Sequence, residues 1–411
     1  MRPALALIVQ KFGGTSVGTI ERIRNVAKRV ARARADGHDV VVVASAMAGE
    51  TNRLLGLATE LAKSPDPREL DALVATGEQV SVALLAIALH AIDVPARSFL
   101  AHQVHLRTDS AFTKARILGI DADRLLETTR EGKVAIVAGF QGVDDQGNVT
   151  TLGRGGSDTS AVAIAAALGS GVVCEIYTDV DGVYTADPNI VKNARKVSRI
   201  SYEEMLELAS LGAKVLQIRS VELAMKYAVP VHVRSSFTDL EKPDVEGTWV
   251  VGEDESLESV VVAGVTSDKN EAQVTVRRIP SGTRNVAALF SALADERVSV
   301  DMIIQNPSVD GATDLTFTVP KGELERAQAV AKSHAGSGEV TTRQDVVKVS
   351  IVGLGMRSHA GVAARMFRLL ADEGISIDAI STSEIKVSCL IASKYGELAV
   401  RVLHDGFGLG E

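Results

Sequence analysis

A chain of 411 residues exceeds what one hydrophobic core supports, so the sequence predicts two or three domains. Its net charge of −8 argues against a general nucleic-acid or anionic-membrane binder, because such binding needs a basic surface. The two cysteines, Cys174 and Cys389, lie in apolar runs far apart, so we expect reduced thiols in a cytoplasmic protein. The sequence shows neither a signal peptide nor an apolar run of membrane-spanning length, so we expect no membrane binding.

Residues 1–235 alternate β-prone runs with helical patterns. Near-continuously apolar runs, typical of strands buried on both faces, occur at 4–10, 39–47, 133–140 and 172–180. A helical pattern covers 19–37 and should end at Gly37, and residues 142–151 have the turn chemistry of a hairpin. These features predict an α/β fold in which helices cover both faces of a mostly parallel sheet.

The segment KFGGTS (11–16) follows the first predicted strand. Gly13 and Gly14 let backbone N–H groups approach a ligand closely, Lys11 adds a positive charge, and we expect the positive end of the next helix to point at the same place. This chemistry suits a phosphate, although a tight turn with a surface lysine gives the same pattern. The motif GxxxxGK[ST] is absent, which disfavours a P-loop nucleoside triphosphatase.

Polar residues also follow the second predicted strand. Ser45 and Thr51 should emerge at the same sheet edge as Lys11, where open α/β sheets bind ligands, although Thr51 is equally suited to cap a helix. Glu78 begins a very apolar helix, where a carboxylate either interacts with the helix dipole or binds a ligand's ammonium group.

The stretch TLGRGGSDTS (151–160) precedes a run of small apolar residues. Ser157 is predicted to cap that helix. Capping does not explain Arg154, which lies between glycines that give its side chain no cover. An arginine held in this way at a helix N-terminus is suited to clamp a carboxylate with two hydrogen bonds.

The segment 177–189 contains hydroxyls, carboxylates and an aromatic ring, which suit a ribose and a base better than a calcium ion. The residues concerned are Thr178, Asp179, Asp181, Tyr184 and Asp187. Further along, Lys214 lies early in a predicted helix and is either a phosphate contact or a solvated lysine.

After an acidic connector at 236–258 that contains one short strand, the sequence repeats itself. ADERVSVDMI (294–303) and ADEGISIDAI (371–380) match at six of ten positions, 77 residues apart. Each copy sits in the order β-α-β-β-α-β, which is the ferredoxin-like pattern. Two tandem copies predict a pair that packs together, within the chain or across a dimer.

The ordered motifs KFGGTS, SAM followed by Thr51, TGE, GRGGSDT, YTDVDGVYTADP, GAKVL and ISTSEIK closely resemble those of the aspartate kinases over essentially the whole chain. The resemblance implies an amino-acid-kinase-type α/β domain at 1–240, a connector at 241–262, and two ferredoxin-like ACT domains at 263–340 and 341–411. It also implies ATP- and Mg²⁺-dependent phosphorylation of the β-carboxylate of L-aspartate, the first step toward lysine, threonine and methionine.

The same resemblance implies roles for individual residues. The expected catalytic residues are Lys11 and Asp158, with Asp158 orienting Lys11 rather than abstracting a proton. Aspartate is expected to contact Ser45, Thr51, Glu78, Arg154 and Ser157. ATP is expected to contact Lys11, Gly13, Gly14, Thr178, Asp179, Tyr184, Asp187 and Lys214. Mg²⁺ should be held mainly through the ATP phosphates, without protein ligands.

Two departures from the family pattern bear on regulation and nucleotide binding. Asn189 stands where the family usually has arginine, so Lys192 or Arg195 is a candidate for the missing contact. In the first repeat, SGTRN (281–285) replaces the usual D-x-P-G turn, whereas the second repeat keeps SHAGVA (358–363). We expect lysine and/or threonine as effectors and at least a dimer formed through the ACT domains, and a separate regulatory chain stays open.

Other functions remain as alternatives. Acetylglutamate, glutamate and uridylate kinases share the glycine-rich start, but the tandem repeats and the combined motifs favour aspartate. A catalytically silent amino-acid sensor is disfavoured by the intact Lys11, Arg154 and Asp158. A dinucleotide dehydrogenase rests only on GLG (353–355), which lacks the third glycine.

Overall fold

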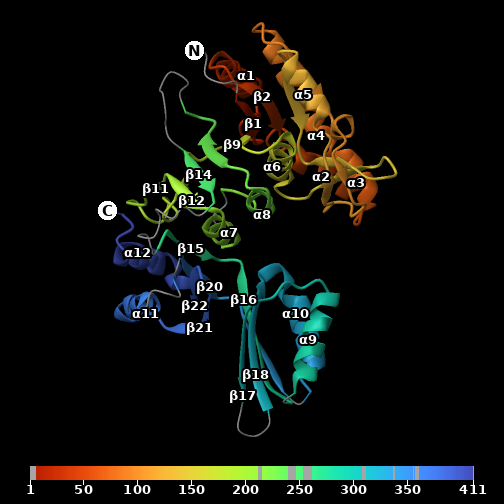
Figure 1. Ribbon diagram of the computed structural model, residues 1–411. Coiled ribbons are helices and arrows are strands. Elements are labelled where there is room, and N and C mark those ends of the chain that lie inside the picture. Colours follow the sequence, from red (N-terminus) through yellow and green to blue (C-terminus); the bar gives the residue numbers. More distant parts are fainter. Residues whose placement is uncertain are drawn as a thin grey trace. The chain divides into compact units, whose positions relative to one another are not determined.

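The computed structural model describes residues 6–211, 215–238, 247–252, 262–280, 282–307, 312–336, 338–354, 356 and 361–410. The chain forms two compact units (Figure 1). The first comprises Met1–Val183, Lys196–Ala209 and Lys214–Glu255, and the second comprises Tyr184–Arg195, Ser210–Ala213 and Ser256–Glu411. The second unit therefore contains a short segment, Tyr184–Arg195, that lies between two parts of the first unit in the sequence.

The first unit is built on an eight-stranded sheet in the order β12-β14-β13-β9-β1-β2-β6-β3, counted over the described residues. Its strands are β1 (Leu7–Phe12), β2 (Asp39–Ala44), β3 (Ala96–Phe99), β6 (Val134–Ala138), β9 (Val173–Thr178), β12 (Arg199–Ser201), β13 (Val231–Ser235) and β14 (Thr248–Val251). All neighbours are parallel except β13 and β14. The predicted mostly parallel sheet is confirmed, and the short strand expected in the connector, β14, belongs to it.

Helices cover both faces of this sheet. The helices described in this unit are α1 (Ile20–Ala35), α2 (Glu50–Leu61), α3 (Pro67–Val74), α4 (Thr76–His90), α5 (Asp123–Arg130), α6 (Gly156–Leu168), α7 (Tyr202–Ser210) and α8 (Ile218–Tyr227). Helices α1 and α4 share one core with alternate residues of β1 and β2, such as Ile8 and Phe12. Lys11, the residue before Phe12, therefore lies on the opposite face of β1 and contacts α6, which packs on β1, β2 and β9.

Helix α1 shows why the local sequence predicts its element. The Thr19 side chain accepts a hydrogen bond from the Arg22 N–H and so caps the helix, whose buried stripe includes Ile23 and Val30. Gly37, at φ 95°, takes the left-handed conformation that ends the helix, as predicted. The glycine-rich segment after β1 is different, because turns separate Gly14 from Ile20. The glycines therefore do not lead directly into α1, and whether the N-terminus of that helix points at a ligand beside Gly13 and Gly14 stays a prediction.

A smaller sheet in the first unit has the strand order β5-β4-β7-β8. Its strands are β4 (Arg107–Thr108), β5 (Ile117–Gly119), β7 (Gln141–Val143) and β8 (Val149–Thr151), and the 3-10 helix η1 spans Ala101–Val104. Strands β7 and β8 are antiparallel and form the predicted hairpin. The hairpin leads from the end of β6 back to the start of α6.

One helical stretch, Pro67–His90, has the length and composition of a membrane span, with a mean hydropathy of 1.8 in its most apolar window. It consists of α3 and α4, and half of that window is buried inside the structure. A core helix of a globular protein meets the same criteria, and the buried face of α4 includes Glu78, Val82, Leu85 and Leu89.

The second unit holds the two repeats. The first has the strand order β17-β18-β16-β19 and contains β16 (Glu271–Pro280), α9 (Thr283–Asp295), β17 (Asp301–Pro307), β18 (Ala312–Pro320), η3 (Lys321–Glu323), α10 (Leu324–His334) and β19 (Glu339–Arg343). This is the predicted β-α-β-β-α-β order. Its core lies between the sheet and the two α-helices.

The second repeat differs from the predicted pattern in its last strand. Its elements are β20 (Val346–Val352), α11 (Val362–Asp372), β21 (Ile377–Thr382), β22 (Lys386–Ala392), η4 (Ser393–Tyr395) and α12 (Gly396–Gly406). The sheet order is β15-β20-β22-β21, so the fourth strand is β15 (Gly264–Asp268), which precedes the first repeat. The prediction of two contiguous copies is wrong here, because β20 finds its outer partner upstream of the first repeat.

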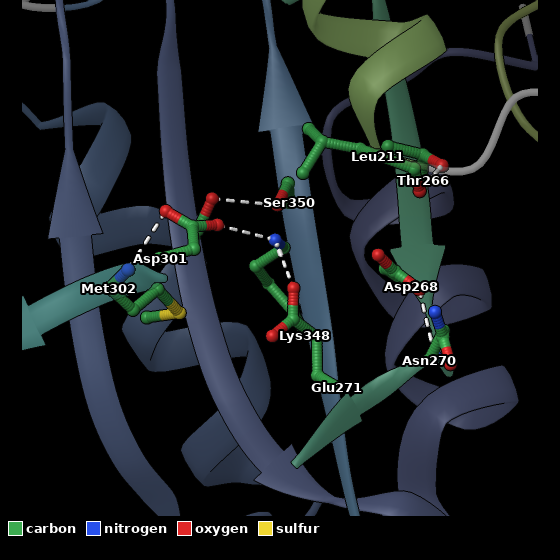
Figure 2. Close-up of polar contacts among 10 residues, drawn as sticks. Leu211, Thr266, Asp268, Asn270, Glu271, Asp301, Met302, Lys348 and Ser350 are labelled. Atoms are coloured by element: carbon green, nitrogen blue, oxygen red, sulfur yellow. Dashed lines mark hydrogen bonds and ion pairs between the residues drawn. The ribbon is translucent and has the colours of Figure 1, made fainter. Parts of the chain in front are cut away.

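A buried lysine joins the two repeats (Figure 2). The Nζ atom of Lys348 on β20 lies 2.6 Å from Oε1 of Glu271 on β16 and 2.6 Å from Oδ2 of Asp301 on β17. Beside this triad, Met302 of the first repeat shares a small apolar cluster with Val346 of the second. The repeats thus form the intrachain pair that the sequence allowed.

The segment Tyr184–Arg195 packs into the core of the second repeat. Ala186 and Val191 are buried in the same cluster as Leu403, and the Thr185 hydroxyl lies 2.9 Å from Nε2 of His404 on α12. The short strands β10 (Val183–Tyr184) and β11 (Lys196–Val197) mark the two ends of this segment.

Candidate active site

A cavity of about 340 Å³ opens at the carboxyl ends of β1, β2 and β6. It is lined by Lys11, Gly14, Ser45, Ala46, Met47, Ala48, Gly49, Thr51, Asn52, Glu78, Phe140, Gly153, Arg154, Gly155, Gly156, Ser157 and Asp158. Open parallel sheets bind ligands at this edge. The structure therefore brings together the residues predicted for aspartate and both predicted catalytic residues.

Lys11 and Asp158 form an ion pair at the bottom of this cavity. The Nζ atom lies 2.6 Å from Oδ1, and both side chains are about a tenth exposed. Lys11 comes from the end of β1 and Asp158 from the first turn of α6. The two groups are close enough to pair by charge, although Asp158 Oδ1 has no hydrogen-bond partner among the described residues. That Asp158 orients the ammonium group for catalysis stays a prediction.

Glu78 contributes a buried carboxylate with one unused oxygen. Its Oε1 accepts a hydrogen bond from the Ala46 N–H at 2.9 Å, whereas Oε2 has no hydrogen-bond partner among the residues described. Burial raises the pKa of this carboxyl group to about 7, which the hydrogen bond from Ala46 opposes. An unpaired buried acceptor of this kind suits a cationic ligand group.

Arg154 is exposed at the mouth of the cavity, and no hydrogen bond or ion pair engages its side chain in the described part of the chain. Its neighbours Gly153 and Gly155 have φ of 77° and 72°, a backbone conformation that favours glycine. The guanidinium is thus carried by a glycine loop and is available to a ligand, as predicted.

The start of α6 differs from the prediction. The N-cap residue is Gly155, in the left-handed conformation, and it offers no side chain. Ser157 lies inside the first turn and lines the cavity, so it does not cap the helix. The Gly156 N–H at the start of the helix donates to the Gly153 carbonyl at 3.0 Å. Because no side chain caps the helix, its positive dipole end is left for a ligand in the cavity that Ser157 lines.

The residues after β2 line the cavity in the predicted way. Ser45 follows the last residue of β2, and its N–H donates to the Phe12 carbonyl at 3.1 Å. Thr51 lies in the first turn of α2, whose N-cap is Gly49 at φ 82°, so Thr51 does not act as the cap. Both hydroxyl residues lie on the cavity wall.

The residues predicted for ATP are more dispersed. Thr178 ends β9, which runs parallel to β1, and its hydroxyl donates to Asp179 at 3.2 Å. Gly13 follows β1 at the same edge, and its N–H donates to the Tyr177 carbonyl at 3.3 Å. Tyr184 and Asp187 belong to the second unit, and Lys214 lies outside the described residues.

The segment around the unusual Asn189 is internally bonded. Asp187 Oδ1 accepts hydrogen bonds from the Asn189 backbone N–H at 2.8 Å and from its amide at 3.0 Å. Of the two candidates for a replacement contact, Arg195 donates from Nε to the Leu409 carbonyl at 3.0 Å. Lys192 stays a candidate for the role.

Sequence reasoning missed Met47, Asn52 and Phe140 as cavity residues. Phe140 has φ of 66°, which is rare for a bulky residue, and its N–H donates to Ser160 Oγ at 3.1 Å. The available signal was its position as the last residue of the apolar run at 133–140, at the sheet edge where Ser45 and Lys11 were also expected.

Comparisons with known proteins agree with this geometry. Residues 6–235 match the amino acid kinase family, and residues 349–407 match an ACT domain. The aspartate kinase of Stutzerimonas stutzeri is 54% identical over 409 residues, 98% of each chain. The structure of Escherichia coli aspartokinase III with aspartate and ADP aligns with a TM-score of 0.81 at 28% identity, covering 97% of this chain and 99% of that one.

The same Escherichia coli enzyme in complex with lysine and aspartate aligns with a TM-score of 0.76 at 27% identity, covering 98% of this chain and 99% of that one. The similarity thus spans both the kinase unit and the repeats. The chain belongs to the amino acid kinase family and, within it, to the aspartate kinases.

Proposed function

We propose that the cavity binds L-aspartate and that the chain transfers the γ-phosphate of ATP to its β-carboxylate, giving 4-phospho-L-aspartate. The observation that supports this most is the set of charges in one cavity. The unpaired oxygen of Glu78 suits the substrate ammonium group, and Arg154 suits a carboxylate. Lys11, held by Asp158, is then left for the reacting carboxylate and the phosphate.

The reaction needs charge neutralisation more than it needs a base. A carboxylate is already a nucleophile, and one of its oxygens forms the new P–O bond as the bond to the β–γ bridging oxygen breaks. Two like charges 4 Å apart repel by about 4 kcal/mol at an effective dielectric constant near 20. Lys11 and the uncapped start of α6 are placed to lower that cost, so catalysis is positioning plus electrostatic stabilisation.

The relatives support nucleotide use, and Escherichia coli aspartokinase III has been solved with ADP and aspartate. For ATP we propose contacts from Gly13, Gly14, Thr178, Asp179, Tyr184, Asp187 and Lys214. Mg²⁺ would be held mainly through phosphate oxygens of ATP and would neutralise their charge.

The repeats support a regulatory role. An ACT domain matches residues 349–407, and the Escherichia coli relative has a structure with lysine and aspartate. We propose inhibition by lysine and/or threonine and an assembly of at least two chains through the ACT repeats. Whether a separate regulatory chain joins this assembly is decided by the mass of the complex purified from its native cell.

Trapping the product tests the substrate. Incubation with ATP, Mg²⁺ and hydroxylamine converts an acyl phosphate to a hydroxamate, and the assay is run with L-aspartate, L-glutamate and N-acetyl-L-glutamate in parallel. We expect hydroxamate with aspartate only. Hydroxamate with either glutamate compound and none with aspartate would contradict the proposal. Repeating the aspartate assay with lysine, threonine and both tests the effectors.

A further inference from the structure

We propose that Arg219, which does not line the cavity, is a positioning residue that holds the loop carrying Arg154. The inference rests on the proposed role of Arg154 in binding a substrate carboxylate. It concerns a different question, namely what keeps an exposed arginine on a glycine loop in the place where it can bind. Neither the sequence motif nor the cavity wall answers that question.

The loop between β8 and α6 is held by backbone hydrogen bonds from the Leu152 N–H to the Phe140 carbonyl and from the Gly156 N–H to the Gly153 carbonyl, but its glycines add no side-chain support. Arg154 lies between Gly153 and Gly155, which lack side chains, and its own side chain forms no contact of a polar kind within the described residues. Glycine backbones have the largest conformational freedom to lose, so a loop built in this way is intrinsically mobile. A bidentate contact with a carboxylate, by contrast, requires placement to within about 0.5 Å.

Arg219 provides the missing support at the base of the loop. Its Nη1 donates to the Leu152 carbonyl at 2.6 Å and its Nη2 to the Ala115 carbonyl at 3.1 Å. The Ala115 N–H in turn donates to the Thr151 carbonyl at 2.9 Å. One guanidinium group therefore joins the backbone at Leu152 to the backbone at Ala115. Leu152 comes directly before Gly153 and is two residues from Arg154.

The helix that carries Arg219, α8, is itself packed against α6, the helix that begins at the cavity. Helix α8 packs along α6, which carries Ser157 and Asp158 (Figure 1). At the N-terminus of α8, the side chain of Gln217 lies against Gly155, where an added Cβ would overlap it. Arg219 thus sets the distance between the carboxylate clamp and the residues at the transferring phosphate.

A second side chain, that of Asp71, also binds the backbone at the base of this loop. Asp71 on α3 accepts hydrogen bonds from the Thr151 N–H at 2.7 Å and the Thr113 N–H at 2.9 Å. Asp71 holds the backbone at Thr151 and Arg219 holds it at Leu152, so the residues up to the start of the glycine loop are fixed. Substituting Arg219 should therefore loosen the loop on the α6 side while Asp71 keeps β8 in the sheet.

The test compares Arg219→Ala and Arg219→Lys with Lys226→Ala, an exposed change on the same helix. We expect Arg219→Ala to raise the KM for aspartate about 10-fold and to change the KM for ATP less than about 2-fold. Arg219→Lys, which reaches one carbonyl only, should give an intermediate KM, and it provides the result if the alanine variant does not fold. Lys226→Ala should leave both KM values unchanged.

A double-mutant cycle separates positioning from general stability. If Arg219 acts through Arg154, then Arg219→Ala has little further effect on the aspartate KM in an Arg154→Ala background. The inference would be overturned if Arg219→Ala raised the KM values for aspartate and ATP equally, or if the effects of the two substitutions on the aspartate KM were additive. It would also be overturned if the aspartate KM were unchanged in both Arg219→Lys and Arg219→Ala. If Arg154→Ala itself leaves the aspartate KM unchanged, the proposed role of Arg154 has failed instead.

Discussion

The Nζ atom of Lys11 lies 2.6 Å from Oδ1 of Asp158, so the end of β1 and the first turn of α6 meet in one buried ion pair. Neither residue needs to exchange a proton with a carboxylate nucleophile. The pair instead keeps a positive charge at the place where the phosphate and the substrate carboxylate, both anionic, must approach each other.

We predict that Lys11→Ala lowers kcat by at least about 10²-fold while ATP still binds, because the charge acts mainly in the transition state. Asp158→Asn should lower kcat less, since it leaves the lysine present but poorly oriented. Steady-state kinetics and nucleotide titration measure the two effects, with the exposed Lys28→Ala on α1 as the control. Near-normal turnover in Lys11→Ala would remove this residue from the mechanism.

The raised pKa of Glu78, about 7, predicts how aspartate binding depends on pH. Below pH 7 the carboxyl group of the free enzyme is protonated and cannot pair with the substrate ammonium group. The KM for aspartate should therefore rise as the pH falls from 8 to 6, by up to about tenfold per unit below the pKa. Glu78→Gln should have a high KM that is nearly independent of pH in this range.

The carboxyl group of Glu78 also affects the stability of the folded chain, which it favours at low pH, whereas it favours aspartate binding at high pH. The pKa of Glu78 in the folded chain lies above its ordinary value of 4.5, so its contribution favours the folded state below pH 4.5 and is lost as the pH rises through 7. Saturating aspartate should restore stability at pH 8 in the parent more than in Glu78→Gln, and thermal unfolding measures both. A parent whose aspartate KM is flat between pH 6 and 8 would show that Glu78 does not bind the ammonium group.

Asp71 gives a prediction about the fold around the site. It is fully buried and accepts three hydrogen bonds, two of them from the N–H and hydroxyl of Thr151. Asp71→Ala leaves these donors unpaired and should lower the free energy of unfolding by about 2–4 kcal/mol. Asp71→Asn should cost less, because the amide oxygen accepts both N–H groups and the Thr151 hydroxyl can turn to accept from the amide.

Urea unfolding of both Asp71 variants measures the difference. Burial raises the pKa of Asp71, and the hydrogen bonds from Thr151 and Thr113 oppose that shift. An asparagine variant as unstable as the alanine variant would show that the negative charge, and not the hydrogen-bonding pattern, holds the base of the loop.

The sequence predicted those parts of the fold that depend on local periodicity. The apolar run at Asp39–Ala44 is a strand because β-branched residues occupy both of its buried faces, and α1 begins at a hydroxyl cap. The partner of β15 could not be predicted in this way. A strand of five residues carries no information on whether it pairs with the repeat that follows it or, as found, with β20 of the next repeat.

In the candidate site, too, local sequence patterns predicted some features, and others depend on backbone conformation or on contacts between distant residues. The motifs predicted which residues gather at the sheet edge, since each follows a strand of a parallel sheet. Two details were beyond reach because they depend on backbone conformation. Gly155 adopts the left-handed region and begins α6 before Ser157, and Phe140 adopts φ of 66°, which places it on the cavity wall. The support from Arg219 depends on a contact between segments 67 residues apart.

The last prediction concerns the triad that joins the repeats. Lys348 and Glu271 are buried, with side chains 5% and 8% exposed, whereas Asp301 is half exposed. Burial opposes the charge on Lys348, but the hydrogen bonds to Asp301 and Glu271 outweigh it and raise the pKa of the lysine. Lys348→Ala leaves Glu271 buried without a counter-charge and should destabilise the repeats by about 3–5 kcal/mol.

Replacing both buried charges distinguishes pairing from packing. Lys348→Met combined with Glu271→Leu keeps the volume and removes the unpaired charge, so most of the lost stability should return, within about 1 kcal/mol of the parent. Asp301 can turn to water because it is half exposed. Urea unfolding of the parent, the single variant and the double variant gives the comparison. A double variant as unstable as Lys348→Ala would mean that the stability comes from the lysine's packing and its pair with Asp301, and not from relieving the charge of Glu271.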